Sequence, residues 1–198
     1  MARKIRSEDE QIKRLRVYNI VAGAIHLAQG LVFLFVLTKL SSQVMFPVPG
    51  VDLPTEQVTF FEVNLGLGVV AFLFLSAFFH FLISLPGVFT RYANGLKQNH
   101  NYFRWTEYAL SSSVMIWLIA QLNGATDFAA LFAIFAVNAS MIMFGALQEK
   151  YEKPGNKKFL PFIFGSMTGI VPWIIIAIYT LQPGSTSAAE GPALSMAS

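Results

Sequence analysis

Cysteine is absent from the 198 residues, and charged side chains are scarce. The lack of cysteine excludes disulfides, a thiolate metal site and a cysteine nucleophile. Charged residues make up 13% of the chain, where soluble domains average about 25%. Apolar residues make up 55%, and 19 residues are Phe. This balance excludes a disordered chain, a nucleic-acid-binding domain and an ordinary soluble enzyme, and it indicates an integral membrane protein whose surroundings are the lipid bilayer.

Five apolar segments are long enough to cross a bilayer as helices, since a spanning helix needs about 20 residues. They are residues 18–40, 58–85, 103–122, 128–147 and 159–181. Barrel strands would be shorter and would alternate in polarity. We therefore predict an all-α integral membrane protein with five transmembrane helices within residues 18–182. Residues 1–17 precede them, and a tail over residues 183–198, rich in Ser, Gly, Ala and Pro, is expected to be disordered.

Basic residues predict the orientation of these helices. Residues 3–16 hold six Lys and Arg, residues 91–104 hold three and residues 150–158 hold four, which leaves only Lys39 elsewhere among the 14. The positive-inside rule then places the N-terminus and residues 1–17 in the cytoplasm, and the C-terminus outside, in a multi-pass protein of the cell membrane.

Two connections between the predicted spans carry further information. The outer loop over residues 41–57 holds three Pro and one Gly and is long enough for a short strand pair. The connection over residues 123–127 is so short that the flanking spans must form an antiparallel hairpin, with Asp127 positioned to cap the second helix.

Among the ionisable residues inside the predicted spans, His26, His80 and Glu107 are the three strong candidates for a functional role. Because such groups are costly in a membrane, each is a candidate functional residue. Ser76 shares a helix face with His80, and Ser112 lies near the face of Glu107, so we expect these five side chains to converge on one polar cavity.

Other roles for these polar side chains remain open. Ser and Asn in spanning helices often only hydrogen-bond neighbouring helices, and His does so as well. Glu107 could instead pair with Arg104 one turn away. Two His and one Glu could also bind a metal, although no metal-binding motif lies on a single helix.

Several stretches resemble the heliorhodopsins, a family of microbial retinal proteins. NYFRWTEYALSSSVMIWLIAQ over residues 101–121 resembles their third helix. NIVAGAIHLAQ around His26 and FLSAFFHF around His80 resemble the first and second helices. FAVNASMIMFGALQEKY resembles the fourth helix, and LPFIFGSMTGIVPWI, followed by QPGSTS, resembles the fifth and its exit.

The resemblance implies a light-sensing function with retinal as cofactor, no ion pumping, no enzymatic activity, and a homodimer. Glu107 matches the counterion of the protonated retinal Schiff base, and His26, His80, Ser76 and Ser112 match the polar cluster beside it. Further positions on the same helices are expected to line the retinal pocket: Tyr108, Met115, Asn138, Met141, Gly145 and Trp173.

The resemblance ends before the last two helices of the family, which include the lysine that carries retinal. We therefore expect a truncated seven-helix bundle in which this chain, as given, cannot attach retinal covalently. An alternative is a retinal-free membrane scaffold or regulatory subunit with an unidentified cytoplasmic partner. A third hypothesis is a small transporter or membrane enzyme that uses the two histidines and Glu107, although the sequence shows no broken-helix pair.

Overall fold

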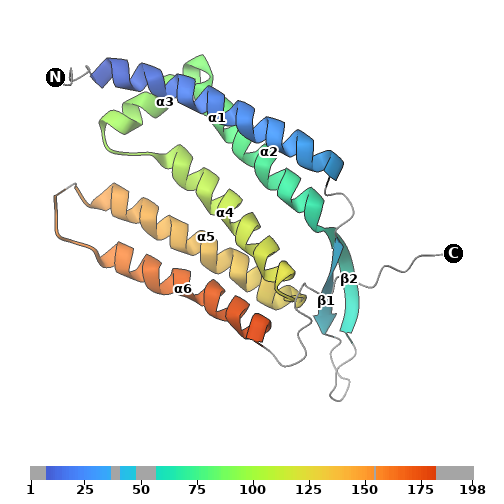
Figure 1. Cartoon of the computed structure of the whole chain (residues 1–198). Coiled ribbons are helices and arrows are strands. Elements are labelled where there is room, and N and C mark those ends of the chain that lie inside the picture. Colours follow the sequence, from blue (N-terminus) through green and yellow to red (C-terminus); the bar gives the residue numbers. More distant parts are fainter. Residues whose placement is uncertain (1–7, 37–40, 48–56, 154, 182–198) are drawn as a thin grey trace, which may run out of the picture.

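The structure, a computed structural model, describes residues 8–36, 41–47, 57–153 and 155–181. Within them lie six helices and one antiparallel pair of strands (Figure 1). In chain order these elements are α1 (Glu8–Val36), β1 (Ser41–Pro47), β2 (Gln57–Asn64), α2 (Leu65–Ser84), α3 (Pro86–Lys97), α4 (Tyr102–Leu122), α5 (Phe128–Tyr151) and α6 (Leu160–Leu181). Lys39 and the tail from Pro183 onward fall outside the described residues.

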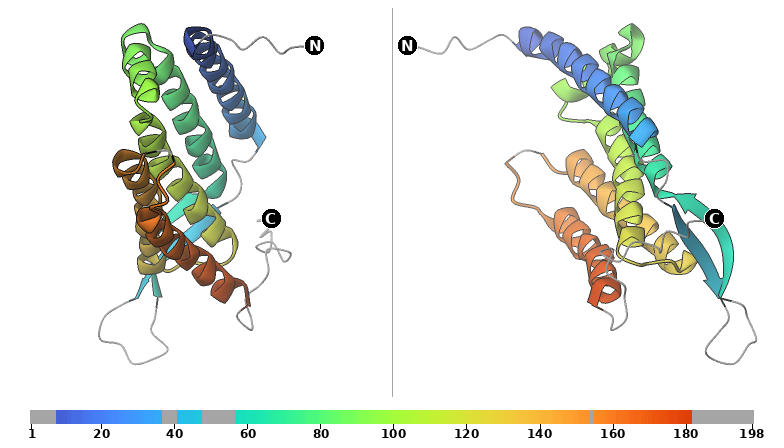
Figure 2. Two further views of the ribbon diagram at one scale, coloured as in Figure 1. Left: turned by 90° about the vertical axis from the view of Figure 1, so that its left-hand side faces the viewer. Right: turned by 45° about the vertical axis from the view of Figure 1, so that its right-hand side comes forward.

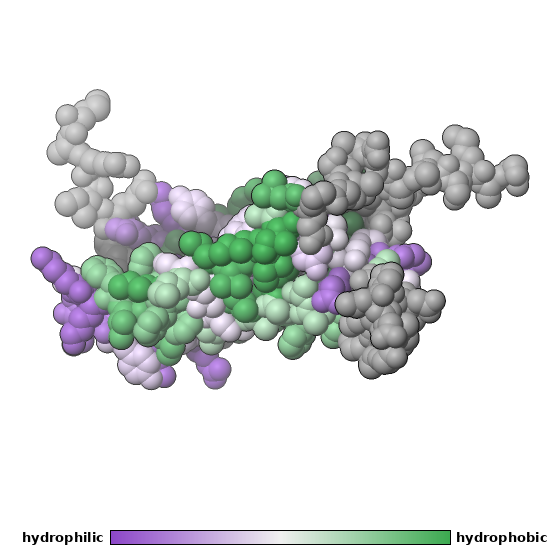
Figure 3. Space-filling view, turned by 90° about the horizontal axis from the view of Figure 1, so that it is seen from below, coloured by the Kyte–Doolittle hydropathy of each residue, from purple (hydrophilic) through white to green (hydrophobic). Residues whose placement is uncertain are grey.

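The long helices pack side by side in chain order, α1 on α2, α2 on α4, α4 on α5 and α5 on α6 (Figures 1 and 2). We call the end of this bundle that holds α3 and the α5–α6 connection the basic end. The strands β1 and β2 lie at the opposite end, here called the hairpin end. Seen from the side that α6 covers, apolar side chains occupy the middle of the surface and hydrophilic ones gather toward its ends (Figure 3).

Four described helices are long and apolar enough to cross a membrane: α1, α2, α5 and α6. They correspond to the first, second, fourth and fifth predicted spans. The third predicted span is the helix α4, whose 21 residues are long enough. Arg104, Glu107 and three serines lower its hydropathy, and it does not join the four.

The second predicted span begins later than expected. Residues 58–64, which we assigned to it, belong to strand β2, and the helix α2 begins at Leu65. β-Branched and aromatic residues dominate this segment, as is typical of strands. Asn64 ends the strand and caps the helix, since its side chain accepts a hydrogen bond from the Leu67 amide at 2.9 Å. The strand pair is thus present, but its second strand extends past the loop in which we predicted it.

The helix α3 was not predicted from the sequence. The backbone of Leu85 is extended (ψ 141°) and Pro86 occupies the first turn, so α2 stops and a new helix starts at once. The resulting 12-residue helix occupies the basic end (Figure 1).

The predicted hairpin of spans three and four is confirmed by α4 and α5. Gly124 takes a positive φ of 90° in the turn, a conformation that favours glycine. Asp127 caps α5 as expected, accepting a hydrogen bond from the Ala130 amide at 2.7 Å. Strand β1 docks on this turn through the Met45 amide, which donates to the Thr126 carbonyl at 2.8 Å.

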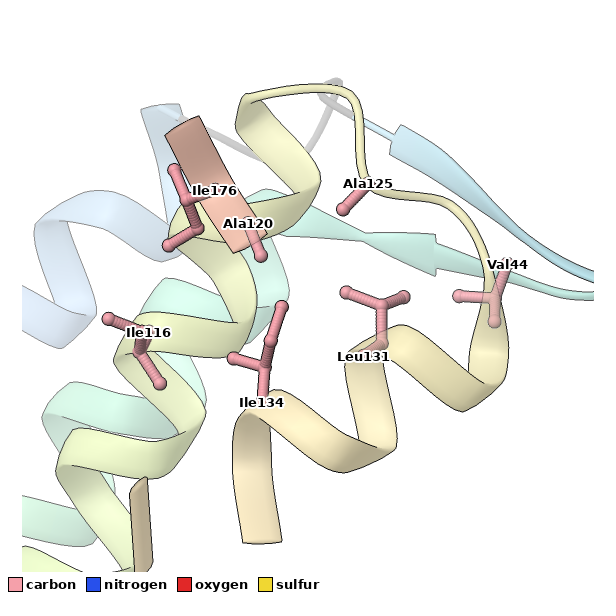
Figure 4. Packing of buried hydrophobic residues seen from close by; sticks show 7 residues of the cluster. All are labelled: Val44, Ile116, Ala120, Ala125, Leu131, Ile134 and Ile176. Atoms are coloured by element: carbon pink, nitrogen blue, oxygen red, sulfur yellow. The ribbon is translucent and has the colours of Figure 1, made fainter. Parts of the chain in front are cut away.

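A cluster of buried apolar side chains holds the hairpin end together. It joins β1, α4, α5 and α6 and consists of Val44, Ile116, Ala120, Ala125, Leu131, Ile134 and Ile176 (Figure 4). Val44 is fully buried against this cluster, which explains why the strand pair stays attached to the helices. Among the described residues, no polar residue of the spans belongs to this cluster.

Candidate functional site

A pair of stacked histidines lies between α1 and α2. The rings of His26 and His80 are 5.6 Å apart between centroids and only 13° from parallel. Gly23 and Gly30, the buried glycines of α1, lie on either side of His26 along the helix. A Cβ on Gly23 would approach the His80 Cβ to 3.2 Å, so these small residues allow the two helices to come close. Two of the residues that we expected to share a polar cavity, His26 and His80, are therefore in direct contact.

His80 is tied to α1 by a second contact. Its Nδ1 lies 2.9 Å from the Oδ1 of Asn19, whose Nδ2 donates to the Leu15 carbonyl at 2.8 Å. One turn further along α2, the Ser84 hydroxyl donates to the His80 carbonyl at 2.8 Å. Arg16 Nε donates to the Ser84 carbonyl at 2.9 Å, which satisfies a free carbonyl at the end of α2. A chain of polar contacts thus leads from the basic end to the histidine pair.

Glu107 is buried on α4, with 6% of its surface exposed. Ser76, which is also buried and lies one turn before His80 on α2, is near enough for its hydroxyl to interact with this carboxylate. Arg104, the alternative partner considered from the sequence, pairs instead with Glu149 at 2.9 Å. Among the residues that the structure describes, no cation pairs with the Glu107 carboxylate. The carboxylate therefore lies beside a hydroxyl but lacks a positive partner within this part of the chain.

Ser112 belongs to a second polar group, between α4 and α5. Its hydroxyl donates to the Tyr108 carbonyl at 2.6 Å and accepts from Asn138 Nδ2 at 2.9 Å. The same Nδ2 lies 3.1 Å from the hydroxyl of Ser113. Asn138 is buried, so these bonds satisfy its amide and fasten α5 to α4.

The other residues expected to line a retinal pocket divide into two sets. Gly145 and Met141 are helix contacts: a Cβ on Gly145 would lie 2.5 Å from the Trp105 ring, and Met141 packs against Gly169 of α6. In contrast, Tyr108, Met115 and Trp173 lie on uncovered faces of α4 and α6, with exposed fractions between 42% and 55%.

A carboxylate at the basic end was missed by the sequence reasoning. Glu149 on α5 accepts from the Trp105 indole Nε1 at 2.6 Å, from the Arg104 guanidinium at 2.9 Å, and from the Asn101 amide. Gln148 beside it bonds the Lys158 carbonyl at 2.9 Å and the Phe162 amide at 3.2 Å. Glu149 lies in LQEKY, a run quoted for the family resemblance. Its hydrogen-bond partners could not be recognised there, because they lie more than 40 residues away in the sequence.

A cavity opens beside Glu149, and Glu107 does not belong to its wall. It has a volume of about 650 Å³ and is bordered by the start of α4, the end of α5 and the start of α6. Arg104, Trp105, Gly145 and Glu149 contribute to its wall. Within the described ranges, no three His, Asp or Glu side chains are grouped closely enough to hold a metal ion.

Four of the five residues predicted to converge thus form contacts at the α1–α2–α4 junction. His26 stacks on His80, and Ser76 lies on the same face of α2 as His80 and near Glu107. Ser112 contacts α5 instead. Asn19 also belongs to this group, because its Oδ1 contacts His80. It lies seven residues before His26 and therefore on the same face of α1.

Comparison with known proteins agrees with the resemblance. A model of the heliorhodopsin family matches residues 15–197, which is most of the chain. No curated protein matches the chain significantly. The match includes all the helices that contribute to the two polar groups described above. This chain belongs to the heliorhodopsin family.

Proposed function

We propose that this protein is a light-sensing membrane protein of the heliorhodopsin type, with Glu107 as the counterion position of a retinal pocket. The observation that carries the proposal is the buried Glu107 carboxylate, which lies near the Ser76 hydroxyl and has no cationic partner among the described residues. A buried carboxylate is costly unless a positive group lies near it, and the protonated attachment group of retinal would supply that charge.

The residues around Glu107 fit this group chemically. Ser76 would orient the carboxylate, and His26 with His80 would form the polar wall behind it. Tyr108, Met115 and Trp173 present apolar and aromatic surface on uncovered helix faces, where a long polyene could pack. Retinal would supply light absorption; the residues of this chain would hold it, position a negative charge and exclude water. We propose that the protein is neither an enzyme nor an ion pump.

For the fold, we propose five spans, with α4 as the third, and a cytoplasmic N-terminus. The basic end carries Arg16, Lys97, Arg104 and Lys150, which supports the assignment of this end to the cytoplasm. α4 packs between α2 and α5, and its polar residues Glu107, Ser111 and Ser113 are buried. Reporters fused after Lys97 and after Leu181 test the topology: the first should be active in the cytoplasm and the second outside. Activity of both reporters on the same side of the membrane would contradict this topology.

We further propose a homodimer formed through α5 and α6. These helices expose large apolar side chains, among them Phe132, Met143, Phe162 and Met167. In a bilayer such side chains can contact lipid or pack against a second copy by van der Waals contact, and the proposal of a dimer comes from the family resemblance. Native mass measurement in mild detergent should show a dimer, and a monomer at every detergent concentration would count against it.

A retinal-free scaffold is the second candidate, because no lysine lies in the interior of any described spanning helix. Its cytoplasmic surface at the basic end would then bind an unidentified protein partner. One reconstitution separates the two proposals. Residues 1–198 are expressed with all-trans-retinal, alone and together with a lysine-bearing two-helix fragment of another heliorhodopsin. A visible band that hydroxylamine bleaches, seen only with the fragment, supports the photoreceptor. A colourless product in both cases favours the scaffold.

A further inference from the structure

The hydrogen bonds of Asn19 determine which nitrogen of His80 carries a proton. The Leu15 carbonyl can only accept a hydrogen bond, and the Asn19 side-chain atom facing it lies at 2.8 Å. That atom must therefore be the amide nitrogen, Nδ2. The amide oxygen, Oδ1, is then the atom that faces the His80 ring, at 2.9 Å from Nδ1.

An amide oxygen accepts and cannot donate, so His80 Nδ1 must be the donor of this bond. A neutral imidazole has one N–H, which leaves Nε2 with a free lone pair. We infer that Asn19 holds neutral His80 in the Nδ1–H tautomer, so that Nε2 is the nitrogen at which His80 accepts a proton or a hydrogen bond.

The geometry around the ring keeps this assignment in place. Stacking on His26, at 5.6 Å and 13°, fixes the plane of the ring. Turning the ring over would bring a carbon opposite Asn19 Oδ1 and would lose the bond. The Ser84 hydroxyl engages the backbone of His80 and not its ring. Asn19 is therefore the positioning residue for the His80 side chain.

The tautomer of His80 bears on the proposed function, and only this part of the inference rests on that function. If the pocket holds retinal near Glu107, His80 would take part in proton exchange through Nε2 alone. Asn19 would set this selectivity without contacting retinal. The tautomer itself follows from Asn19, Leu15 and His80 whether or not retinal binds.

The tautomer can be measured directly by nitrogen NMR of the 15N-histidine-labelled chain in lipid bilayers without retinal. The chain holds only three histidines, and the signals that disappear in H80Q belong to His80. In the unmodified protein at a pH where His80 is neutral, Nδ1 should give a protonated signal and Nε2 an unprotonated one. The reverse pattern would overturn the inference without any further variant.

Asn19→Ala tests the cause. Loss of this half-buried hydrogen bond should shift the ratio of the tautomers about tenfold toward Nε2–H, which corresponds to about 1.4 kcal/mol. Asn123→Ala is the matched control, because Asn123 also donates to a carbonyl one turn back, that of Ile119 at 2.8 Å, and accepts from another helix through Oδ1. The control should leave the His80 signals unchanged. An unaltered ratio in N19A, or an equal change in N123A, would refute the role of Asn19.

The proposed function and the tautomer can fail separately. If the chain stays colourless even with the lysine-bearing fragment while His80 is in the Nδ1–H tautomer, retinal binding is contradicted but the tautomer assignment stands. A coloured protein with His80 in the Nε2–H tautomer would do the reverse.

Discussion

Glu149→Gln is expected to weaken the attachment of α4 to α5 at the basic end. In the structure, one carboxylate accepts from the Trp105 indole, the Arg104 guanidinium and the Asn101 amide. Glutamine offers a single oxygen and places an NH₂ group where the second carboxylate oxygen lies. At least one donor then faces another donor, and the ion pair with Arg104 is lost.

The cost follows from the exposure of each partner. The Arg104 side chain is 44% exposed, so its ion pair contributes at most about 1 kcal/mol. A hydrogen bond to a charged group that is less exposed contributes about 1.5–3 kcal/mol, and one such bond is lost with Trp105 or Asn101. We therefore expect the free energy of unfolding to fall by about 2–4 kcal/mol.

The assay is denaturant-induced unfolding in mixed detergent micelles, followed by Trp fluorescence. Glu152→Gln is the matched control, because Glu152 lies at the same end of α5 and its substitution removes the same charge. No hydrogen bond of its side chain is present among the described residues. Equal destabilisation by the two substitutions would refute the reasoning, since it would attribute the effect to net charge alone.

Three further predictions follow from packing and from the lysine positions. Gly145→Ala should destabilise the protein in the same assay, because a Cβ would lie 2.5 Å from the Trp105 ring, whereas Gly87→Ala, with nothing within 4 Å, should be neutral or slightly stabilising; equal effects would contradict this packing. Leu131→Ala should lower the free energy of unfolding by about 2–5 kcal/mol, since Leu131 is fully buried, and a loss below that of exposed Phe132→Ala would contradict it. Residues 1–198 mixed with all-trans-retinal alone should show no visible band that hydroxylamine bleaches; such a band would mean that a lysine of this chain forms the bond.

Sequence patterns predicted the parts of the fold that depend on length and local chemistry. A run of about 20 apolar residues predicts a spanning helix regardless of its neighbours, and a short polar turn predicts an antiparallel hairpin. The Asp127 cap was predictable because its hydrogen bond is made within one turn. We expected His26 and His80 to share one polar cavity because they are rare ionisable residues at similar depth.

The parts that depend on contacts between distant residues were not predictable. Strand β2 is apolar enough to be taken for the start of a span, and only its pairing with β1 identifies it. Helix α3 contains Arg91 and Lys97, so residues 86–97 were interpreted as a loop. The partners of Glu149 and the direction of Ser112 depend on which helices are neighbours. Periodicity also cannot distinguish a residue on an uncovered helix face, such as Trp173, from one that is packed between helices.

The most direct test asks whether Glu107 is the counterion of bound retinal. The pigment reconstituted from residues 1–198 and a lysine-bearing fragment would be measured with Glu107, with Glu107→Gln and with Glu152→Gln. If Glu107 is the counterion, removing its charge should shift the visible band to longer wavelength or abolish it, while Glu152→Gln leaves the band in place. An unchanged band and unchanged hydroxylamine bleaching in Glu107→Gln would contradict the assignment of Glu107 to the retinal pocket.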